Sequence, residues 1–390
     1  MMSAIPCSPE FAKTLESLGL NLIFNVTEDL DWTWFFNTYS NEIYKRGISF
    51  QSSQKAAFLL DYATFGQMVT IFTDVPGKTA NQLFGLMQDQ SFLIGWGSDE
   101  FKLVSTSSAW SIFVHAADWA MNIATLSNFP TNQTTQKHPS PSPPPSRQNV
   151  HTVCFLMTDG DNIQWLLDGF SSSNWYGSPS RGKVPLGWTL SPALGRLSGP
   201  TLSSIYDNAT ENDYFVAAPS GIGYIYPDYY NTKNLMAYAQ LTSLFMKNSD
   251  LNIINVLAAT NRTSTVSPFL QQENIDAVFY YLFENYSGMN GTIEFVEGKP
   301  VIGGRYNLWE GFETAQSLAA KLNVASREVT SEDGYSLIPV HVWSRTVEDV
   351  VLCQSLLNST NVQVVTPSEF VKLIAQNVVQ KGKNYRVYIC

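Results

Sequence analysis

The sequence is poor in positive charge, in histidine and in cysteine. Its 390 residues include 23 Lys and Arg against 33 Asp and Glu, which gives a formal net charge of -10. Nucleic-acid binders carry basic stripes and this chain has none, so neither nucleic acid nor an anionic membrane is expected as a partner. The four histidines contain no i, i+4 pair and the four cysteines lack metal-ligand spacing, so no metal or other cofactor is expected. Cys154 lies in an apolar run and is expected to be a buried thiol.

Long hydrophobic runs are also absent. No run of about 18 apolar residues occurs, so no membrane insertion is expected, and the first residues lack the pattern of a signal peptide. Hydrophobic residues make up 44% of the chain and charged residues 14%, which excludes a mainly disordered chain and a coiled coil. Asn-x-Ser/Thr sequons are slightly more frequent than chance gives, and they favour an extracellular or secretory glycoprotein.

Proline and serine are concentrated in residues 130–149, which we expect to form an exposed linker. The linker divides the chain into an N-terminal part, 1–129, and a C-terminal part, 150–390. Strand-like and helix-like segments alternate in both parts, a pattern typical of parallel sheets. In the first part we expect strands at 20–24, 67–73 (buried), 91–96 and 110–116, and helices at 10–18, 29–46 and 79–88.

The C-terminal part repeats this alternation about seven times. The expected strands are 151–158, 213–218, 252–259, 276–283, 299–304, 336–343 and 362–366, and the main helices are 232–248, 311–322, 346–358 and 367–379. We therefore predict an α/β protein with an incomplete, about seven-stranded β/α barrel-like C-terminal domain and a smaller α/β N-terminal domain. An open α/β sheet also fits the pattern; long loops after several strands favour the barrel.

Acidic residues follow the first strand of the C-terminal part. Asp159 and Asp161 flank a glycine and precede Asn162, at the strand end where barrel enzymes place catalytic groups. Two neighbouring carboxyl groups can divide acid and base roles when one pKa is raised. The alternative is an Asp-rich turn that only caps the next helix.

Aromatic residues are abundant, at 13% of the chain, and several stand beside acids at expected strand ends. Tryptophan faces stack on sugars while carboxylates accept hydroxyl hydrogens, although aromatic rings also fill cores and aspartates also cap helices. The residues with this placement are Trp96, Asp99 and Glu100, then Asp118 and Trp119, then Arg305, Tyr306 and Glu310, and finally His341 and Trp343.

The loop Gly221-Ile222-Gly223-Tyr224-Ile225-Tyr226-Pro227 also follows an expected strand. It has two of the glycines of a dinucleotide-binding loop but Tyr226 in the third position, and it lacks the G-x-S-x-G of a nucleophile elbow. Either its tyrosines bind a substrate or the loop is simply well packed.

This loop resembles the signature for which the GxGYxYP family is named. Further family-like blocks are TDGDNIQW (158–165), GWTLSPAL (187–194), ENDYFVAAPSGIGYIYP (211–227), KPVIGGRYNLW (299–309) and VVTPSEFVKLI (364–374), with GWGSDE (95–100) and ADW (117–119) in the preceding domain. The resemblance implies a barrel-like C-terminal domain beside small α/β N-terminal domains, and glycoside hydrolase activity.

From these observations we expect a glycoside hydrolase that acts on a glycan by carboxylate acid/base chemistry. The alternatives are a non-catalytic glycan-binding protein and a metal-dependent polysaccharide deacetylase that uses Asp159 and His341. The expected catalytic residues are Asp159, Asp161, Glu100 and Glu310. The expected substrate-binding residues are Trp96, Asp99, Asp118, Trp119, Asn162, Trp165, Tyr224, Tyr226, Arg305, Tyr306, His341 and Trp343.

Overall fold

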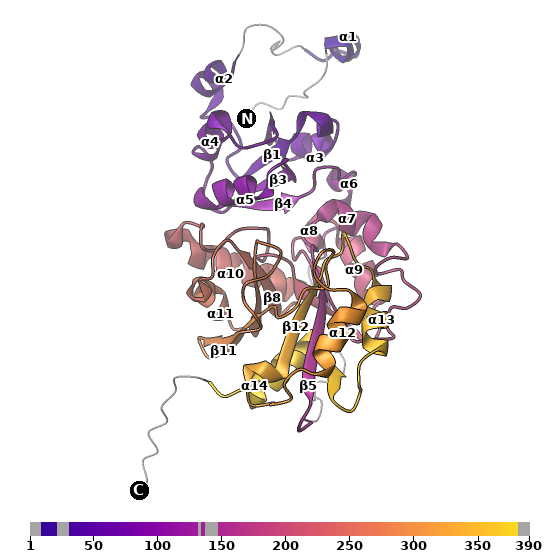
Figure 1. The fold of residues 1–390 in the computed structure, drawn as a ribbon. Coiled ribbons are helices and arrows are strands. Elements are labelled where there is room, and N and C mark those ends of the chain that lie inside the picture. The colour runs from indigo at the N-terminus through magenta and orange to yellow at the C-terminus, as the bar shows by residue number, and fades with distance from the viewer. Residues whose placement is uncertain (1–8, 22–30, 132–133, 137–146, 381–390) are drawn as a thin grey trace.

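A computed structural model describes residues 9–21, 31–131, 134–136 and 147–380, and these ranges contain two separate β-sheets. Figure 1 shows the smaller, N-terminal sheet at the top of the molecule and the larger sheet below it. The α/β class predicted from the alternation of segments is confirmed.

The N-terminal sheet has four parallel strands in the order β2-β1-β3-β4. The predicted strand 67–73 is β2, but it lies at the sheet edge and only Ile71 of its four residues is buried, so the expectation of a buried strand was wrong. The predicted strand 20–24 lies mostly outside the described residues. The elements are α1 (Pro9–Ser17), α2 (Trp32–Tyr39), β1 (Gly47–Gln51), η1 (Ser53–Lys55), α3 (Leu60–Phe65), β2 (Val69–Phe72), α4 (Lys78–Phe84), β3 (Ser91–Trp96), α5 (Glu100–Ala109), β4 (Ile112–Ala116) and α6 (Ile123–Leu126).

The larger sheet has nine strands in the order β10-β11-β9-β8-β7-β6-β5-β12, with β13 paired to β5. The first set of elements is β5 (His151–Met157), α7 (Ile163–Leu167), η2 (Gly169–Ser171), β6 (Leu186–Leu190), α8 (Leu194–Leu197), α9 (Gly199–Asp207), β7 (Asp213–Ala217), α10 (Thr232–Asn248), β8 (Ile253–Ala258), η3 (Thr263–Val266) and α11 (Ser267–Leu270). The second set is β9 (Ala277–Leu282), β10 (Ile293–Val296), β11 (Lys299–Gly303), α12 (Ala315–Asn323), η4 (Glu332–Gly334), β12 (Tyr335–Val340), α13 (Val347–Ser355), β13 (Val362–Val364) and α14 (Pro367–Asn377).

The sheet curls, because the chain after β11 returns to β12 at the far end of the strand order. Parallel bridges join Gly304 to Leu337 and Leu308 to Val340. All seven predicted strands of this part are present, and β6 and β10 were missed. β10 belongs to a hairpin with β11, whose two turn residues, Glu297 and Gly298, both have positive φ as tight hairpins require.

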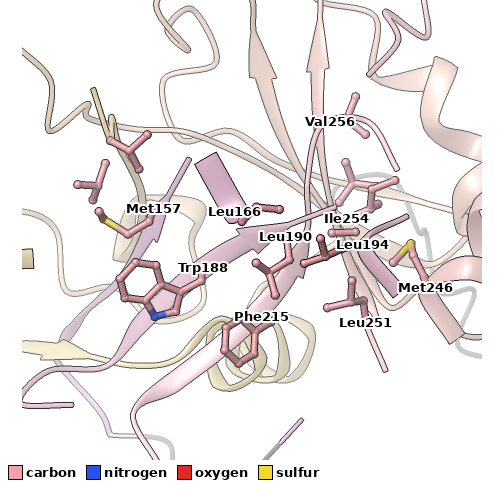
Figure 2. Packing of buried hydrophobic residues seen from close by; sticks show 14 of the residues in the cluster. Met157, Leu166, Trp188, Leu190, Leu194, Phe215, Met246, Leu251, Ile254 and Val256 are labelled. Atoms are coloured by element: carbon pink, nitrogen blue, oxygen red, sulfur yellow. The ribbon is translucent and has the colours of Figure 1, made fainter. Parts of the chain in front are cut away.

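Strands β5 to β8 are buried along their whole length, as expected for parallel strands covered on both faces. Figure 2 shows part of the core, where Trp188 and Leu190 of β6 lie among Met157, Phe215 and helix residues. Cys154 of β5 is buried and free, which confirms that prediction. This packed sheet is the rigid support for the loops at its strand ends.

The segment predicted as an exposed linker is anchored where it is described. Gln136 is 2% exposed, and its side-chain amide donates to the carbonyl of Asp250 at 2.6 Å and accepts from the amide of Phe215 at 3.0 Å. The expectation of exposure is therefore wrong at this residue, because its amide group completes the hydrogen bonding at the edge of β7.

The loop 221–227 joins the two sheets. The amide of Tyr224 donates to the carbonyl of Val114 in β4 at 2.8 Å, and the amide of Val114 donates back at 3.0 Å. The amide of Tyr226 donates to the hydroxyl of Ser108 at the end of α5, at 3.1 Å. These bonds fix the position of the N-terminal sheet relative to the larger one.

Candidate functional site

A cavity of about 330 Å³ lies between the two sheets. Its wall comes from the carboxyl ends of strands in both sheets: β3 and β4 from one, and β5, β7, β8, β9 and β12 from the other. Parallel strands gather their carboxyl ends at one edge, and here two such edges face each other. The lining residues are Trp96, Glu100, Asp118, Trp119, Asp159, Asp161, Asn162, Gln164, Pro219, Tyr224, Leu257, Tyr286 and Trp343.

Glu100 reaches the cavity from the first turn of α5. Asp99 caps this helix by accepting the amide of Lys102 at 2.9 Å, which sets the direction of the chain at Glu100. The hydroxyl of Tyr224 donates to Oε1 of Glu100 at 2.8 Å. Burial raises the pKa of Glu100 to about 7, the Tyr224 hydrogen bond opposes this, and the charge of Asp159 adds to it. Glu100 therefore exchanges a proton near neutral pH.

Asp159 lies at the turn after β5, with a left-handed φ of 64°. Its carboxyl group accepts hydrogen bonds from the hydroxyl of Thr158, from Nε1 of Trp343 at 3.2 Å and from the hydroxyl of Tyr286 at 3.5 Å. Burial raises the pKa of Asp159, and these three donors lower it by stabilising the charged form.

Gly160 makes this turn possible. A Cβ atom there would lie 1.8 Å from the carbonyl oxygen of Thr189 in β6. Its amide donates to the hydroxyl of Thr189 at 2.9 Å. The close approach of the two backbones thus holds Asp159 and Asp161 at the cavity wall.

Asp161 is 7% exposed. Burial and the charges of Asp159 and Glu100 raise its pKa well above the usual range. Among the described residues, no side chain donates a hydrogen bond to its carboxyl group. Next to it, Nε2 of Gln164 donates to Oδ1 of Asn162 at 3.0 Å, while the buried Oε1 of Gln164 has no partner in the described chain.

Aromatic rings form much of the remaining wall. Trp96 stacks on Tyr224 with ring centroids 6.3 Å apart. Trp119 and Trp343 are 51% and 48% exposed, so they are available at the rim. Nζ of Lys55 lies 3.6 Å from the Trp119 ring centroid and 2.7 Å from Oδ2 of Asp118, which neutralises that carboxylate.

The structure brings many of the predicted site residues together. Those that line the cavity are Trp96, Glu100, Asp118, Trp119, Asp159, Asp161, Asn162, Tyr224 and Trp343. All of them stand at or just beyond strand ends, or in the loop that joins the sheets.

Two predicted carboxylates, Asp99 and Glu310, lie outside the lining, and so do the predicted aromatic residues Trp165 and Tyr226. Asp99 is a helix cap and Glu310 is exposed on the surface. Trp165 is buried in α7 behind Trp343, with ring centroids 5.6 Å apart. Tyr226 is fully buried behind Tyr224, with hydroxyl oxygens 3.2 Å apart. These aromatic residues support the wall from behind.

Arg305 and Tyr306 line a separate, smaller cavity of about 140 Å³. The guanidinium of Arg305 is occupied by the backbone carbonyls of Gly291, Glu332 and Tyr335, at 3.3, 2.9 and 2.9 Å. It holds loops together and leaves no donor group at the main cavity.

His341 also lies one layer behind the main cavity. Its ring stacks on Trp309 with centroids 3.5 Å apart, and Nδ1 lies 3.0 Å from the hydroxyl of Ser344. Burial lowers its pKa to about 4, so the imidazole is neutral at physiological pH. In the described ranges, no three His, Cys, Asp or Glu side chains are grouped to hold a metal ion.

Sequence reasoning missed four residues of the lining: Gln164, Pro219, Leu257 and Tyr286. Tyr286 follows β9 by a few residues, so the strand-end rule could have identified it. Pro219 lies two residues before Gly221, the first residue of the loop signature. Leu257 lies inside β8 and carries no polar signal.

Comparison with known proteins agrees with the resemblance in the sequence. No curated protein matches the chain. A crystal structure of a putative hydrolase from Bacteroides thetaiotaomicron superposes with a TM-score of 0.82 at 28% sequence identity, over 94% of this chain and 73% of that one. No helix among the described residues has the length and apolar character needed to span a membrane. Residues 45–128 match the GxGYxYP third domain, and residues 149–375 match the GxGYxYP putative glycoside hydrolase C-terminal domain. The chain therefore belongs to the GxGYxYP family.

Proposed function

We propose that this protein is a glycoside hydrolase whose catalytic carboxyl groups come from both domains. The observation that carries the proposal is the convergence of Glu100, Asp159 and Asp161 on one aromatic-lined cavity, with the pKa of Glu100 near 7. Glycoside hydrolysis needs one carboxyl group that donates a proton and another that stays ionised. Aromatic faces at the rim suit the apolar faces of sugar rings.

In this proposal Glu100 is the general acid. A carboxyl group with a pKa close to the working pH is protonated often enough to donate and acidic enough to do so readily. We assign Asp159 as the ionised partner: burial raises its pKa, and three hydrogen-bond donors oppose that rise by stabilising its charge. It serves either as nucleophile or as the base that activates water. Glu310, which is exposed and outside the cavity, has no role in this mechanism.

Release of reducing sugars from a panel of polysaccharides and oligosaccharides tests the proposal. We expect wild-type protein to cleave at least one substrate and Asp159→Asn to lose roughly 100- to 10,000-fold in kcat, the usual contribution of a positioned carboxyl group. Glu310→Gln removes the same kind of charge outside the cavity and should behave as wild type. Circular dichroism establishes that each variant is folded.

Two results contradict the proposal. Full activity of Asp159→Asn on a cleaved substrate would remove that residue from the mechanism. Glycan binding without cleavage of any substrate would instead assign the protein as a non-catalytic glycan-binding protein. The deacetylase alternative requires a histidine at the cavity, and His341 lies behind its wall.

A further inference from the structure

The charged side chains that line the cavity are all acidic. Four carboxyl groups line it, and none of the lining residues is Lys, Arg or His. The cation beside it, Lys55, is occupied by Asp118 and by the face of Trp119. The side chain of Arg305 lines the separate, smaller cavity, and that of His341 stacks on Trp309, so neither lines this one. A negatively charged ligand would therefore meet carboxylates without any compensating positive group.

Among the described residues, the buried polar atom of the lining that has no hydrogen-bond partner is an acceptor. Donors already reach Asp159 and Glu100, from Thr158, Trp343, Tyr286 and Tyr224. No side chain in the described chain donates to the carboxyl group of Asp161. Oε1 of Gln164, a lining residue that is 6% exposed, is a buried acceptor without a partner among the described residues. Buried polar groups without partners are costly, so a ligand that supplies donors gains the most here.

Common sugar substituents differ in what they supply. A carboxylate or sulfate supplies no donor and adds repulsion. A hydroxyl supplies one donor, and an acetamido group supplies one donor and one acceptor but no charge. A protonated amine supplies three donors and a positive charge, which pairs with a buried carboxylate and is attracted to tryptophan faces.

We infer that the cavity takes a glycan with free-amine hexosamine units, such as glucosamine, with Asp161 as the partner of the ammonium group. The inference rests on the proposed function, because it names the substrate class of the same cavity. Gln164 accepts a second ammonium hydrogen, and Trp96, Trp119 or Trp343 covers a face of the ring. Glu100 and Asp159 remain free for the glycosidic bond.

Isothermal calorimetry with defined tetrasaccharides tests the inference. The protein is Glu100→Gln, which keeps Asp159 and Asp161 but lacks the proposed acid. The ligands are the tetramers of glucosamine, of N-acetylglucosamine, of glucose and of galacturonate, at about pH 6, below the ~7.7 typical of an amino group next to an electron-withdrawing centre. We expect the glucosamine tetramer to bind roughly tenfold more tightly than the glucose tetramer, and galacturonate to bind weakest.

A second substitution assigns the effect to Asp161. Adding Asp161→Asn should reduce the preference for glucosamine over glucose to about threefold or less, because the amide is neutral and of the same shape. Adding Glu310→Gln changes the total charge equally but outside the cavity, and it should leave the preference intact.

Three calorimetric outcomes overturn the inference: equal affinity for the glucosamine and glucose tetramers, a preference for the acetylated tetramer, or a glucosamine preference that survives Asp161→Asn. A rise in melting temperature with CaCl2 that Asp161→Asn abolishes would also overturn it, because the acidic wall would then hold a metal ion. Failure of the proposed function looks different. In that case wild-type protein binds glucosamine oligomers through Asp161 but releases no reducing sugar from them or from neutral glycans.

Discussion

Both sheets contribute residues from the carboxyl ends of their strands to the same cavity, but they position their acidic residues differently. In the nine-stranded sheet, Asp159 and Asp161 sit on a turn fixed by Gly160 against β6, and three donors surround Asp159. In the N-terminal domain, Glu100 lies in the first turn of α5, and one hydroxyl, that of Tyr224, donates a hydrogen bond to it. That hydroxyl belongs to the larger domain.

This difference separates two tasks. In the larger domain, three donors of the same domain oppose the rise that burial causes in the pKa of Asp159. In the smaller domain, the group that opposes the rise in the pKa of Glu100 is a hydroxyl from the other domain. The loop 221–227, which carries the family signature, forms the contact between the two domains. Within it, Tyr224 pairs with β4 through its backbone and with Glu100 through its side chain. The following predictions test this division, beginning with the largest expected effect.

The first prediction separates the acid from its partner by the leaving group of the substrate. Glu100→Gln should lose roughly 100- to 10,000-fold in kcat on a natural glycan and regain most of it on a dinitrophenyl glycoside, whose leaving group needs no proton. Asp159→Asn should lose activity on both substrates. Steady-state kinetics with the two substrates measures this difference. Equal losses of Glu100→Gln on both substrates would contradict its role as the acid.

The second prediction concerns the rigidity of the larger domain. Gly160→Ala places a Cβ atom where the carbonyl oxygen of Thr189 already lies, at 1.8 Å, so the backbone must move. We expect a loss of about 1–3 kcal/mol in the free energy of unfolding, the usual cost of forced overpacking. Gly77→Ala is the control, since its Cβ atom meets nothing within 4 Å and its φ of -110° suits alanine. Urea denaturation measures the free energy of unfolding of both variants. Equal values would show that the backbone of this turn adjusts to the added methyl group at no cost in stability.

The third prediction uses the pH dependence of stability. The pKa of Glu100 rises from 4.5 to about 7 on folding, so the folded state holds this proton more tightly than the unfolded state. The contribution of Glu100 to stability is therefore present below pH 4.5 and is lost as pH rises to about 7. Wild type should lose up to roughly 3 kcal/mol relative to Glu100→Gln across this interval.

Urea denaturation at a series of pH values measures this difference. Asp159 and Asp161 have pKa shifts of the same sign, so the variant itself still loses some stability as pH rises. Parallel curves for the two proteins would contradict a raised pKa for Glu100.

Sequence analysis identified those cavity residues for which both the residue type and the position after an expected strand indicated a site. Asp159, Asp161 and Trp119 were identified because acids and aromatic residues follow apolar strands, and parallel sheets collect such positions at one edge. Arg305 and His341 obey the same rule, yet they lie outside the cavity. Arg305 instead donates to backbone carbonyls of neighbouring loops, and His341 stacks on Trp309. These contacts depend on how the curled sheet brings the loops together, which the sequence pattern does not state.

Two further features could not be obtained from the sequence. The pairing of Tyr224 with Glu100 joins residues 124 positions apart and exists only because two sheets meet end to end. β6 was missed because its short run, Leu186–Leu190, contains a glycine and lies among prolines and serines. Its burial against β5 and β7 makes it a strand, which is a property of the assembled sheet and not of the segment.

The last prediction tests the contact between the domains by removing a single hydroxyl group. Tyr224→Phe removes the hydroxyl that donates to Glu100 but keeps the ring and the backbone pairing with Val114. Because this hydrogen bond lowers the pKa of Glu100, its loss should raise that pKa further, by about one unit or less. The basic limb of the pH profile of kcat/KM, where the acid loses its proton, should then move to higher pH.

Tyr226→Phe is the matched control, because it removes a neighbouring hydroxyl and leaves the bond between Tyr224 and Glu100 in place. Its basic limb should stay close to that of wild type. If Tyr224→Phe instead lowered activity equally at every pH, the tyrosine would position the domains without tuning the acid. The two domains would then differ only in how rigidly they hold their acidic residues.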